Sequence, residues 1–569
     1  MRIHVLLLGA LAAAPLVAAQ SQRRDPDFGP NVTIFGPSTP SRIIQSKLDT
    51  IFAAQESNQF GAPRYAVLFK PGTYDVDTRI GFYTHVAGLG LSPDDVVING
   101  GLRADARWRK GNATLNFWRV VENMSVVPAG GFERWAVSQA APMRRMHIRG
   151  DLLLSDSGWS SGGFLADSKV DGQVQSGSQQ QWITRNSALG GWTGSNWNMV
   201  FVGTQNAPAN SFPNPPFTTI GAAPVIREKP FLTVDRRGEW QVFVPALRSN
   251  AEGTSWSSGR PRGVGHPLTE FVIVTPGTSA ATMNDALARG KNLIIAPGIY
   301  HLDVPLRVTR PNAIILGLGL ATLVPDNGVS AITVDDVDGV TLAGLLIDAG
   351  PTNSPVLVQI GRSRSSVRHA SNPTLLSDLF VRVGGAGIGK ATRSLEINSN
   401  DVIGDHLWLW RADHGNGVSW TSNTAANGLV VNGNNVTMYG LFVEHYQDYQ
   451  VQWYGNGGRT YLFQNEMPYD VPTQAEWMSG ATMGFAAYRV DAAVTSHEAW
   501  GLGSYCFFNK NPAVIADHAF EVPVTPGVRL RNMVTVSLGG GKGTITHVIN
   551  ATGAAAQAGA TVQKLVSGP

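Results

Sequence analysis

Apolar residues in this chain come in short runs that are separated by Gly, Asn or Asp at close intervals. Most runs are rich in Val, Ile, Leu or Thr and none keeps a helical period for long, which is typical of short strands joined by tight turns. The clearest runs lie at 331–334, 340–342, 345–347, 429–431 and 436–439. We expect parallel strands stacked in coils, with each run buried against those above and below it. Helices are expected only at 42–56 and 280–289.

One segment with this pattern occurs twice. Residues 67–74 read Val-Leu-Phe-Lys-Pro-Gly-Thr-Tyr, and residues 293–300 read Leu-Ile-Ile-Ala-Pro-Gly-Ile-Tyr. Each copy continues with a short strand and then a glycine turn, at 87–90 and 316–319. A strand, a Pro-Gly turn, a Tyr and a second strand are typical of the start of a right-handed β-helix, in which the glycines permit the sharp corners. The duplication therefore favours two β-helices over a β-sandwich with strands at similar spacing.

The predicted fold is all-β, with two tandem right-handed parallel β-helices packed side by side. The first helix is expected to occupy 20–247 and the second 268–569. The stretch 248–267 is rich in Ser, Gly, Arg and Trp and is interpreted as the linker between them.

Composition and charge narrow the functional classes. The chain has 569 residues, 43% of them hydrophobic, so it can bury a large core. The net charge is +3 with 15% charged residues, and such a weak field disfavours nucleic acid as a partner. Cys506 is the single cysteine, so no intrachain disulfide can form and we expect a buried, apolar role for it.

The first residues indicate a signal peptide at 1–19. Arg2 precedes an apolar run at 5–17, and small side chains follow before Gln20. The run is too short for a membrane span, so we expect a secreted, soluble protein without a membrane partner. A dibasic pair at 23–24 is either a processing site or two surface arginines. Five Asn-x-Ser/Thr sequons are typical of a glycosylated secreted protein, and they begin at Asn31, Asn112, Asn123, Asn435 and Asn550.

Several motifs in the second half follow one another in an order that resembles a single enzyme family. They are Gly404–His414, Asn427–Val431, Met438–His445, Tyr449–Gln452 and Gln464–Tyr469. This series resembles glycoside hydrolase family 55, the double β-helix exo-β-1,3-glucanases of fungi and actinomycetes. Weaker matches at 180–186, 224–232, 497–503 and 520–523 extend the resemblance over most of the chain. The resemblance implies a pectate-lyase-like fold, a laminarin-type β-1,3-glucan as substrate, exo action and inversion at the anomeric carbon.

Glu444 and Glu466 are the candidate catalytic pair. They are 22 positions apart, close to one coil of a β-helix, so their backbones should lie on adjacent rungs roughly 4.8 Å apart. Two carboxyls in one site repel each other, which raises the pKa of one of them and suits a general acid. The resemblance implies that Glu466 is this acid and that Glu444 helps to hold the attacking water. Inverting enzymes keep their carboxyls roughly 6.5–9.5 Å apart, so stacking alone does not establish inversion.

The remaining site residues are expected to bind substrate. The resemblance implies that a glutamine of the first helix assists, either Gln180 or Gln181. Aromatic faces suit the C–H face of a pyranose ring, although packing in the core explains such residues equally well. The other candidates are Trp192, Trp408, Trp410, Asp413, His414 and Tyr469. No cofactor is required, and no His, Cys or Asp cluster has the spacing of a metal site.

Two other functions stay open. One is a different β-helix enzyme, such as a pectate lyase or a polygalacturonase. The acidic cluster at 335–338 is not followed by the basic motif that a lyase requires, and no Gly-His-Gly motif of a polygalacturonase occurs. The other is a non-catalytic carbohydrate-binding β-helix. In each case the expected partner is a polysaccharide, bound by a monomer.

Overall fold

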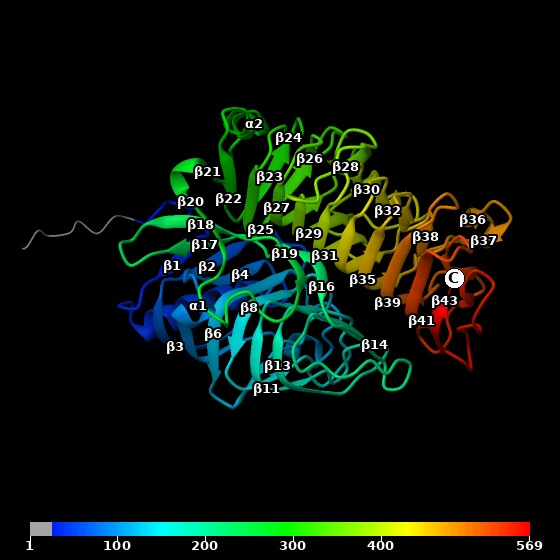
Figure 1. Ribbon diagram of the computed structural model, residues 1–569, viewed down its shortest axis with the longest axis horizontal. Helices are drawn as coiled ribbons and strands as arrows, with labels where there is room; N and C mark the ends of the chain where they lie inside the picture. The colour runs from blue at the N-terminus through cyan, green and yellow to red at the C-terminus, as the bar shows by residue number, and fades with distance from the viewer. Residues whose placement is uncertain (1–24, 569) are drawn as a thin grey trace, which may run out of the picture.

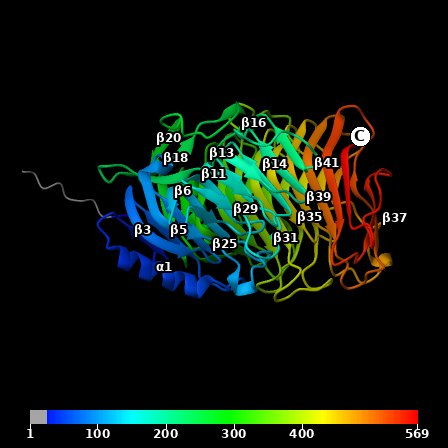
Figure 2. The same cartoon turned by 90° about the horizontal axis from the view of Figure 1, so that it is seen from below.

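The computed structural model describes residues 25–568, and in it two right-handed parallel β-helices lie side by side (Figure 1). The same arrangement is visible from below, where the strands of both helices run across the long axis of the molecule (Figure 2). The predicted all-β fold is confirmed. The predicted signal peptide at 1–19 and the dibasic pair lie outside the described residues.

The first helix is built on one sheet in which successive coils pair in parallel from β1 to β15. It opens with one α-helix, α1 (Ser41–Gln55), which confirms the helix expected at 42–56. Its strands are β1 (Val32–Phe35), β2 (Tyr65–Phe69), β3 (Gly72–Arg79), β4 (Thr84–Gly88), β5 (Val96–Arg103), β6 (Arg119–Pro128), β7 (Phe132–Arg134), β8 (Pro142–Ile148), β9 (Asp151–Leu153), β10 (Phe164–Ala166), β11 (Lys169–Gln175), β12 (Gln181–Arg185), β13 (Ala188–Thr193), β14 (Asn198–Val202) and β15 (Phe217–Ile220).

A short antiparallel region follows the first helix. Its strands are β16 (Ala223–Ile226), β17 (Phe231–Val234), β18 (Trp240–Pro245), β19 (Arg248–Ala251) and β20 (Gly263–Pro267). The segment 248–267, interpreted as a linker, contains two of these strands. β19 pairs with β16 and β20 pairs with β18, so this segment is tied back onto the residues before it.

The second helix has two long sheets that share its coils and are parallel except at the end of the larger one, where β43 pairs antiparallel with β41. The helix expected at 280–289 is α2 (Ala280–Ala288). The strands are β21 (Phe271–Val274), β22 (Asn292–Ile295), β23 (Ile299–Leu302), β24 (Leu306–Val308), β25 (Ile314–Pro325), β26 (Ile332–Val334), β27 (Thr341–Asp348), β28 (Ser354–Ile360), β29 (Leu375–Val383), β30 (Ala391–Ile397), β31 (Ile403–Arg411), β32 (Ala425–Val431), β33 (Thr437–Glu444), β34 (Val451–Trp453), β35 (Gly458–Glu466), β36 (Met478–Ser479), β37 (Thr482–Met483), β38 (Tyr488–Val490), β39 (His497–Cys506), β40 (Ile515–Glu521), β41 (Val528–Ser537), β42 (Thr544–Ile549) and β43 (Val562–Gly568).

The duplicated sequence makes the same contact in both helices. The hydroxyl of Tyr74 donates to the carbonyl of Lys70 at 2.7 Å, and that of Tyr300 donates to the carbonyl of Ala296 at 2.8 Å. Each tyrosine thus ties the second strand of the motif back to the end of the first across the Pro-Gly turn. Because each hydroxyl has an acceptor, both rings can be buried in the cores of their own helices.

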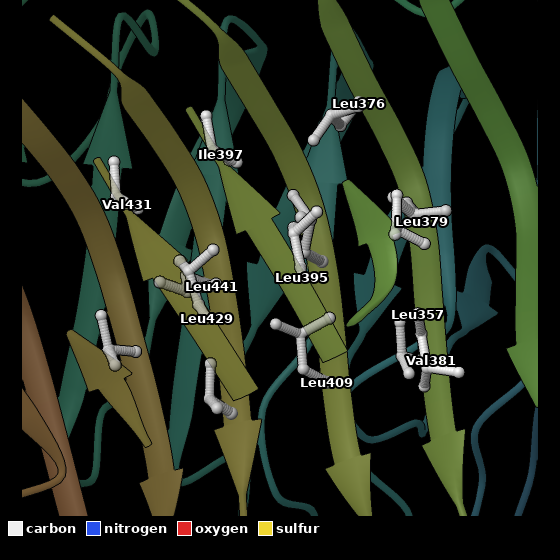
Figure 3. Close-up of a cluster of buried hydrophobic side chains, with 14 of the residues drawn as sticks. Leu357, Leu376, Leu379, Val381, Leu395, Ile397, Leu409, Leu429, Val431 and Leu441 are labelled. Atoms are coloured by element: carbon white, nitrogen blue, oxygen red, sulfur yellow. The ribbon is translucent and has the colours of Figure 1, made fainter. Parts of the chain in front are cut away.

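Each helix has its own apolar core, in which side chains from successive coils stack. In the second helix, Leu, Ile and Val from β28 to β33 form such stacks, with Val381 and Leu409 on consecutive coils (Figure 3). A third apolar cluster joins the helices and contains Phe117 and Trp118 of the first with Phe380 and Trp408 of the second. The cleft described below lies at the edge of this joint cluster.

Buried ion pairs also connect the two helices. Arg144 of β8 binds Asp378 and Asp405 of the second helix, at 2.7 Å in each case. Arg185 of β12 binds Asp405 at 2.9 Å and Glu228 at 2.7 Å. All five side chains are almost completely buried, so each charge depends on its partners rather than on water.

Candidate active site

Glu444 and Glu466 lie on adjacent rungs, as the 22-residue spacing predicts. Glu444 ends β33 and Glu466 ends β35, and the two residues are register partners in the parallel sheet. The same row continues with Trp410 on the coil before and Tyr505 on the coil after. The candidate catalytic pair is therefore the centre of a row that faces the first helix.

A bend in each long strand brings this row close to the first helix. His406, Gly440 and Leu462 occupy the same place in three consecutive coils, and each has a positive φ, of 68°, 64° and 59°. A left-handed residue within a strand interrupts the ladder and re-aims the side chains that follow it. At Gly440 a side chain has no room, because a Cβ would lie 2.9 Å from the ring of Phe164 in the first helix.

The first helix presents a matching row across the cleft. Gln139, Ser161 and Gln180 come from consecutive coils, since Ser161 N donates to Ser138 Oγ and Gln180 N donates to the carbonyl of Ser160. The two rows enclose a pocket of about 230 Å³. It is lined by Thr114, Leu115, Phe117, Gln139, Ser161, Gln180, Trp408, Trp410, Asp413, His414, Glu444, His445, Glu466, Tyr469 and Leu538.

Glu444 lies at the bottom of this pocket and is held on both oxygens. Oε1 accepts from Gln139 Nε2 at 3.0 Å, and Oε2 accepts from Trp408 Nε1 at 2.8 Å. Ser161 is part of the same group, because its Oγ accepts from Gln139 Nε2 at 3.3 Å and from Gln464 Nε2 at 3.2 Å. N–H groups from both helices thus surround one carboxylate.

Glu466 has different partners. The hydroxyl of Tyr469 donates to its Oε2, and His445 Nε2 lies 3.6 Å from the same oxygen. His445 Nδ1 lies 3.0 Å from the carbonyl of Met467, which fixes the ring. Oε1 of Glu466 has no hydrogen-bond partner among residues 25–568, and 16% of the side chain is exposed, so this oxygen is available to a bound molecule.

Burial raises the pKa of both carboxyls. For Glu444 the charge of Glu466 adds to the effect of burial and lifts the pKa well above its usual value, although the N–H of Trp408 opposes this. For Glu466 burial also raises the pKa, and the nearby His445 and the hydroxyl of Tyr469 partly offset the rise. Two such neighbours cannot both ionise easily, so the pair retains a proton to higher pH than a single exposed glutamate does.

Asp413 and His414 form the wall beside Glu466. His414 Nδ1 lies 2.8 Å from Asp413 Oδ1, and its Nε2 contacts Gln59 of the first helix. Burial would raise the pKa of Asp413, but the charges of His445 and His414 outweigh it and lower the pKa to about 2. Asp413 is therefore ionised and accepts hydrogen bonds at pH values at which the glutamate pair still retains a proton.

Most of the predicted binding residues meet in this pocket, and two do not. Gln180, Trp408, Trp410, Asp413, His414 and Tyr469 all line it. Gln181 is completely buried and its Oε1 accepts a hydrogen bond from the hydroxyl of Tyr505, so its role is to join the helices. Trp192 lies on β13, away from the pocket, where its ring packs edge-on against Phe201. Its assignment to the site is corrected.

Three further residues of the site, Gln139, Ser161 and Gln464, are not predicted from the sequence. Gln139 and Ser161 carry no motif, whereas Gln464 opens the motif Gln464–Tyr469 but is given no role by it. Gln139 and Ser161 could be found only from the coil spacing of the first helix, 22 positions apart like the two glutamates. Gln464 stands two positions before Glu466 on the same strand, so strand alternation places both side chains on one face.

The sequons differ in accessibility. Asn123 is completely buried with a φ of 60°, and its Nδ2 donates to the carbonyls of Gly88 and Gly90 at 2.8 and 2.7 Å. A glycan cannot be attached there in the folded protein, so Asn123 is withdrawn as a glycosylation site. The asparagines that keep partial exposure are Asn31, Asn112, Asn435 and Asn550.

The described part of the chain offers no candidate metal centre. Within residues 25–568, no group of three or more His, Cys, Asp or Glu side chains is arranged to hold a metal ion. No helix in this part of the chain is both long enough and apolar enough to span a bilayer.

Comparisons with known proteins agree with this architecture. Residues 271–466 match the family model described as LAM55 pectate lyase-like domain. An exo-beta-1,3-glucanase of Streptomyces sp. (strain SirexAA-E / ActE) is 55% identical over 97% of this chain and 94% of its own. The solved structure of sacteLam55A from Streptomyces sp. SirexAA-E superposes with a TM-score of 0.94 at 55% identity, covering 96% of this chain and 99% of that one. A glucose complex of a sacteLam55A variant gives the same TM-score at 54% identity, with the same coverage of both chains.

The similarity to these proteins extends over nearly the whole chain, including both helices and the cleft between them. The protein is a member of glycoside hydrolase family 55.

Proposed function

We propose that the protein hydrolyses β-1,3-glucan from a chain end, with Glu466 as the general acid. The observation that carries this proposal is the pair of glutamates on adjacent rungs, Glu444 buried and Glu466 partly exposed, in a pocket lined by both helices. The 55% identical relative is an exo-beta-1,3-glucanase, and a variant of the superposed structure binds glucose. Both support a glucan as the substrate.

The different hydrogen bonds of the two glutamates support different roles for them. Glu466 keeps Oε1 free and lines the pocket, so when it carries the proton that the pair shares it can protonate the glycosidic oxygen as the bond to C1 breaks. Glu444 faces Gln139 and Ser161, and this group can hold a water between donors and acceptors. The water attacks C1 and passes its proton to Glu444. The pair thus begins and ends the reaction with one shared proton, and the next cycle requires its return to Glu466.

The pocket shape supports exo action. On one side of the glutamate pair, Phe117 of the first helix contacts Trp408 of the second, with ring centroids 4.8 Å apart. On the other side, Trp197 contacts Tyr505, with centroids 4.6 Å apart. A long chain cannot pass through a site that is bridged at both ends, so only a terminal sugar can enter. A volume of about 230 Å³ suits a single sugar ring rather than a row of them.

Replacement of each glutamate by glutamine tests the roles separately. Glu466→Gln should abolish the release of glucose from laminarin but retain hydrolysis of β-glucosyl fluoride, because fluoride leaves without a proton. Glu444→Gln should lose both reactions. Glu252→Gln, at an exposed position, serves as the matched control. Laminarin hydrolysis by Glu466→Gln at the parent rate would contradict the assignment. Direct attack of water on C1 inverts its configuration, so release of β-glucose as the first product would also contradict it.

We also propose that the protein is secreted and acts outside the cell as a monomer. The support is the signal-peptide pattern at 1–19 together with four partly exposed sequons. N-terminal sequencing of protein from the culture medium should begin at or after Gln20. Protein that starts at Met1 and stays inside the cell would contradict the proposal, and light scattering gives the oligomeric state.

A further inference from the structure

His406 is a completely buried histidine between the two helices, and it does not line the pocket. It lies on β31 at one of the bends described above, with a φ of 68°. Its ring stacks on Phe164 of the first helix, with centroids 4.4 Å apart and planes 11° apart. Phe380 and Phe442, on the coils before and after, contact the ring edge-on. Because aromatic rings pack on three sides of it, the imidazole is held in one orientation.

Both ring nitrogens of His406 face a hydrogen-bond acceptor. Nδ1 lies 2.9 Å from Oδ1 of Asp378, and Nε2 lies 3.1 Å from the carbonyl oxygen of Gln139. A carboxylate and a carbonyl only accept, so the ring donates to both when both nitrogens carry a proton. Asp378 is itself held by Arg144 at 2.7 Å. His406 thus connects an anchored carboxylate of the second helix to the backbone of the first.

The carbonyl that His406 binds belongs to a residue whose side chain donates to Glu444. Gln139 Nε2 lies 3.0 Å from Oε1 of Glu444. Gln139 occupies a bend between β7 and β8 rather than a strand, and its φ is 37°. Residues other than glycine rarely adopt a positive φ, so this bend depends on the bonds that hold it. The Gln139 carbonyl accepts from Ala141 N at 2.8 Å in addition to His406.

The position of this carbonyl determines where the side chain of Gln139 points. The peptide group is planar, so a rotation that moves the carbonyl also turns the Cα–Cβ bond next to it. A donor to a catalytic carboxylate contributes most when it is held in place before the reaction begins. Without the N–H of His406 the bend can relax, and the amide of Gln139 then moves away from Glu444.

We propose that His406 is a positioning residue, which holds the backbone of Gln139 so that its side-chain amide donates to Glu444. This inference rests on the proposed glucanase function and adds to it a residue outside the pocket. The link runs from Asp378 through His406 to Gln139, so it crosses from the second helix to the first before it returns to Glu444. Because Gln139 lies beside the attacking water, loss of the link should lower kcat and leave KM nearly unchanged.

Two substitutions of His406 separate the two bonds of its ring. Glutamine places its amide nitrogen near the position of Nε2 and can reach the carbonyl of Gln139, whereas asparagine places its nitrogen near that of Nδ1 and reaches only Asp378. Both remove the ring and its stacking. Backbone strain acts against the expected order, because asparagine tolerates a positive φ better than glutamine does.

The expected result on laminarin is a loss of kcat that glutamine largely restores. His406→Asn should lower kcat about tenfold, less than loss of the donor itself would, with KM changed less than about twofold. His406→Gln should keep about half of the parent kcat or more, because it retains the donor to the Gln139 carbonyl. The matched control is His497→Asn, which replaces another buried histidine and should keep the parent kcat.

Combination with Gln139→Ala tests whether His406 acts through Gln139. In that background no amide is left to position, so adding His406→Asn should lower kcat by less than about twofold. A tenfold loss in both backgrounds would overturn the proposal and indicate a structural role, and so would equal kcat values for His406→Asn and His406→Gln. If His406→Asn does not fold, His406→Phe replaces it with the same expectation, because phenylalanine keeps the stack on Phe164 but has no donor. A parent enzyme that releases no glucose from laminarin would instead refute the proposed function itself.

Discussion

Replacing Asp405 by alanine tests whether buried ion pairs hold the two helices together. The Asp405 side chain is completely buried and accepts from Arg144 Nη1 at 2.7 Å and from Arg185 Nε at 2.9 Å. Both arginines belong to the first helix and Asp405 belongs to the second. Alanine removes the negative charge, and both guanidinium groups stay in a site that excludes water.

The expected loss of stability follows from what each arginine keeps. Removing one partner of a buried ion pair costs about 3–5 kcal/mol. Arg144 retains Asp378 and Arg185 retains Glu228, so neither charge is left alone. We therefore expect a loss near the lower end of this range, about 3 kcal/mol, in the free energy of unfolding.

Urea denaturation followed by tryptophan fluorescence measures this change, because Trp118 and Trp408 lie in the cluster between the helices. The matched control is Asp285→Ala, which breaks an exposed pair with Arg289 on α2 and should cost less than about 1 kcal/mol. Equal shifts in the urea midpoint for both variants would refute the reasoning. A shift found only for Asp405→Ala supports it.

Three further outcomes are expected. Trp408→Phe removes the N–H that donates to Glu444 at 2.8 Å. A hydrogen bond to a charged group is worth about 1.5–3 kcal/mol, so kcat should fall roughly tenfold to a hundredfold. Unchanged steady-state kinetics on laminarin would contradict this expectation. Gln139→Ala should lower kcat roughly a hundredfold with a smaller change in KM, as loss of a preorganised donor does, and KM rising alone would argue for a binding role. Burial lowers the pKa of His497 to about 3, so between about pH 6.5 and 3 the unfolded chain binds a proton that the folded chain does not. Stability should fall with falling pH in that window by up to about 1.4 kcal/mol per unit, and His497→Leu should remove this dependence in urea titrations; parallel losses in both proteins would exclude His497 as the cause.

The coil period explains which parts of the site the sequence predicts. Coils of the second helix differ in length, since register partners from β29 to β39 lie 28, 34, 22 and 39 positions apart, and the 22-residue spacing of Glu444 and Glu466 matches one whole coil. The duplicated Pro-Gly-x-Tyr segment likewise predicts two helices, because each copy begins a separate stack. Two of the expected strands, at 340–342 and 345–347, are one strand, β27, bent at Gly344 with a φ of 70°.

The spacing of the strands along the chain does not indicate how the two helices pack against each other. Nothing in the spacing of the first helix indicates that Gln139 reaches Glu444, because that contact depends on the lateral fit of two separate stacks. Strand alternation places Gln180 and Gln181 on opposite faces, but it does not indicate which face meets the partner helix. In the structure Gln180 lines the pocket and Gln181 is buried against Tyr505. For the same reason the sequence does not distinguish Trp192, which does not line the pocket, from Trp408 and Trp410, which do.

The docking of the helices explains why the fold contains two of them. The second helix alone supplies both carboxyls, but Glu444 would then lack Gln139 and the joint cluster that excludes water from one side of the pocket. Without burial the pKa of Glu466 would lie closer to that of an exposed glutamate, and less of the acid would be protonated near neutral pH. The first helix therefore helps to raise the pKa of Glu466 by burying it, without a hydrogen bond to its carboxyl group. A variant that loosens the interface, such as Asp405→Ala, should shift the basic limb of the pH–rate profile to lower pH before it unfolds the protein.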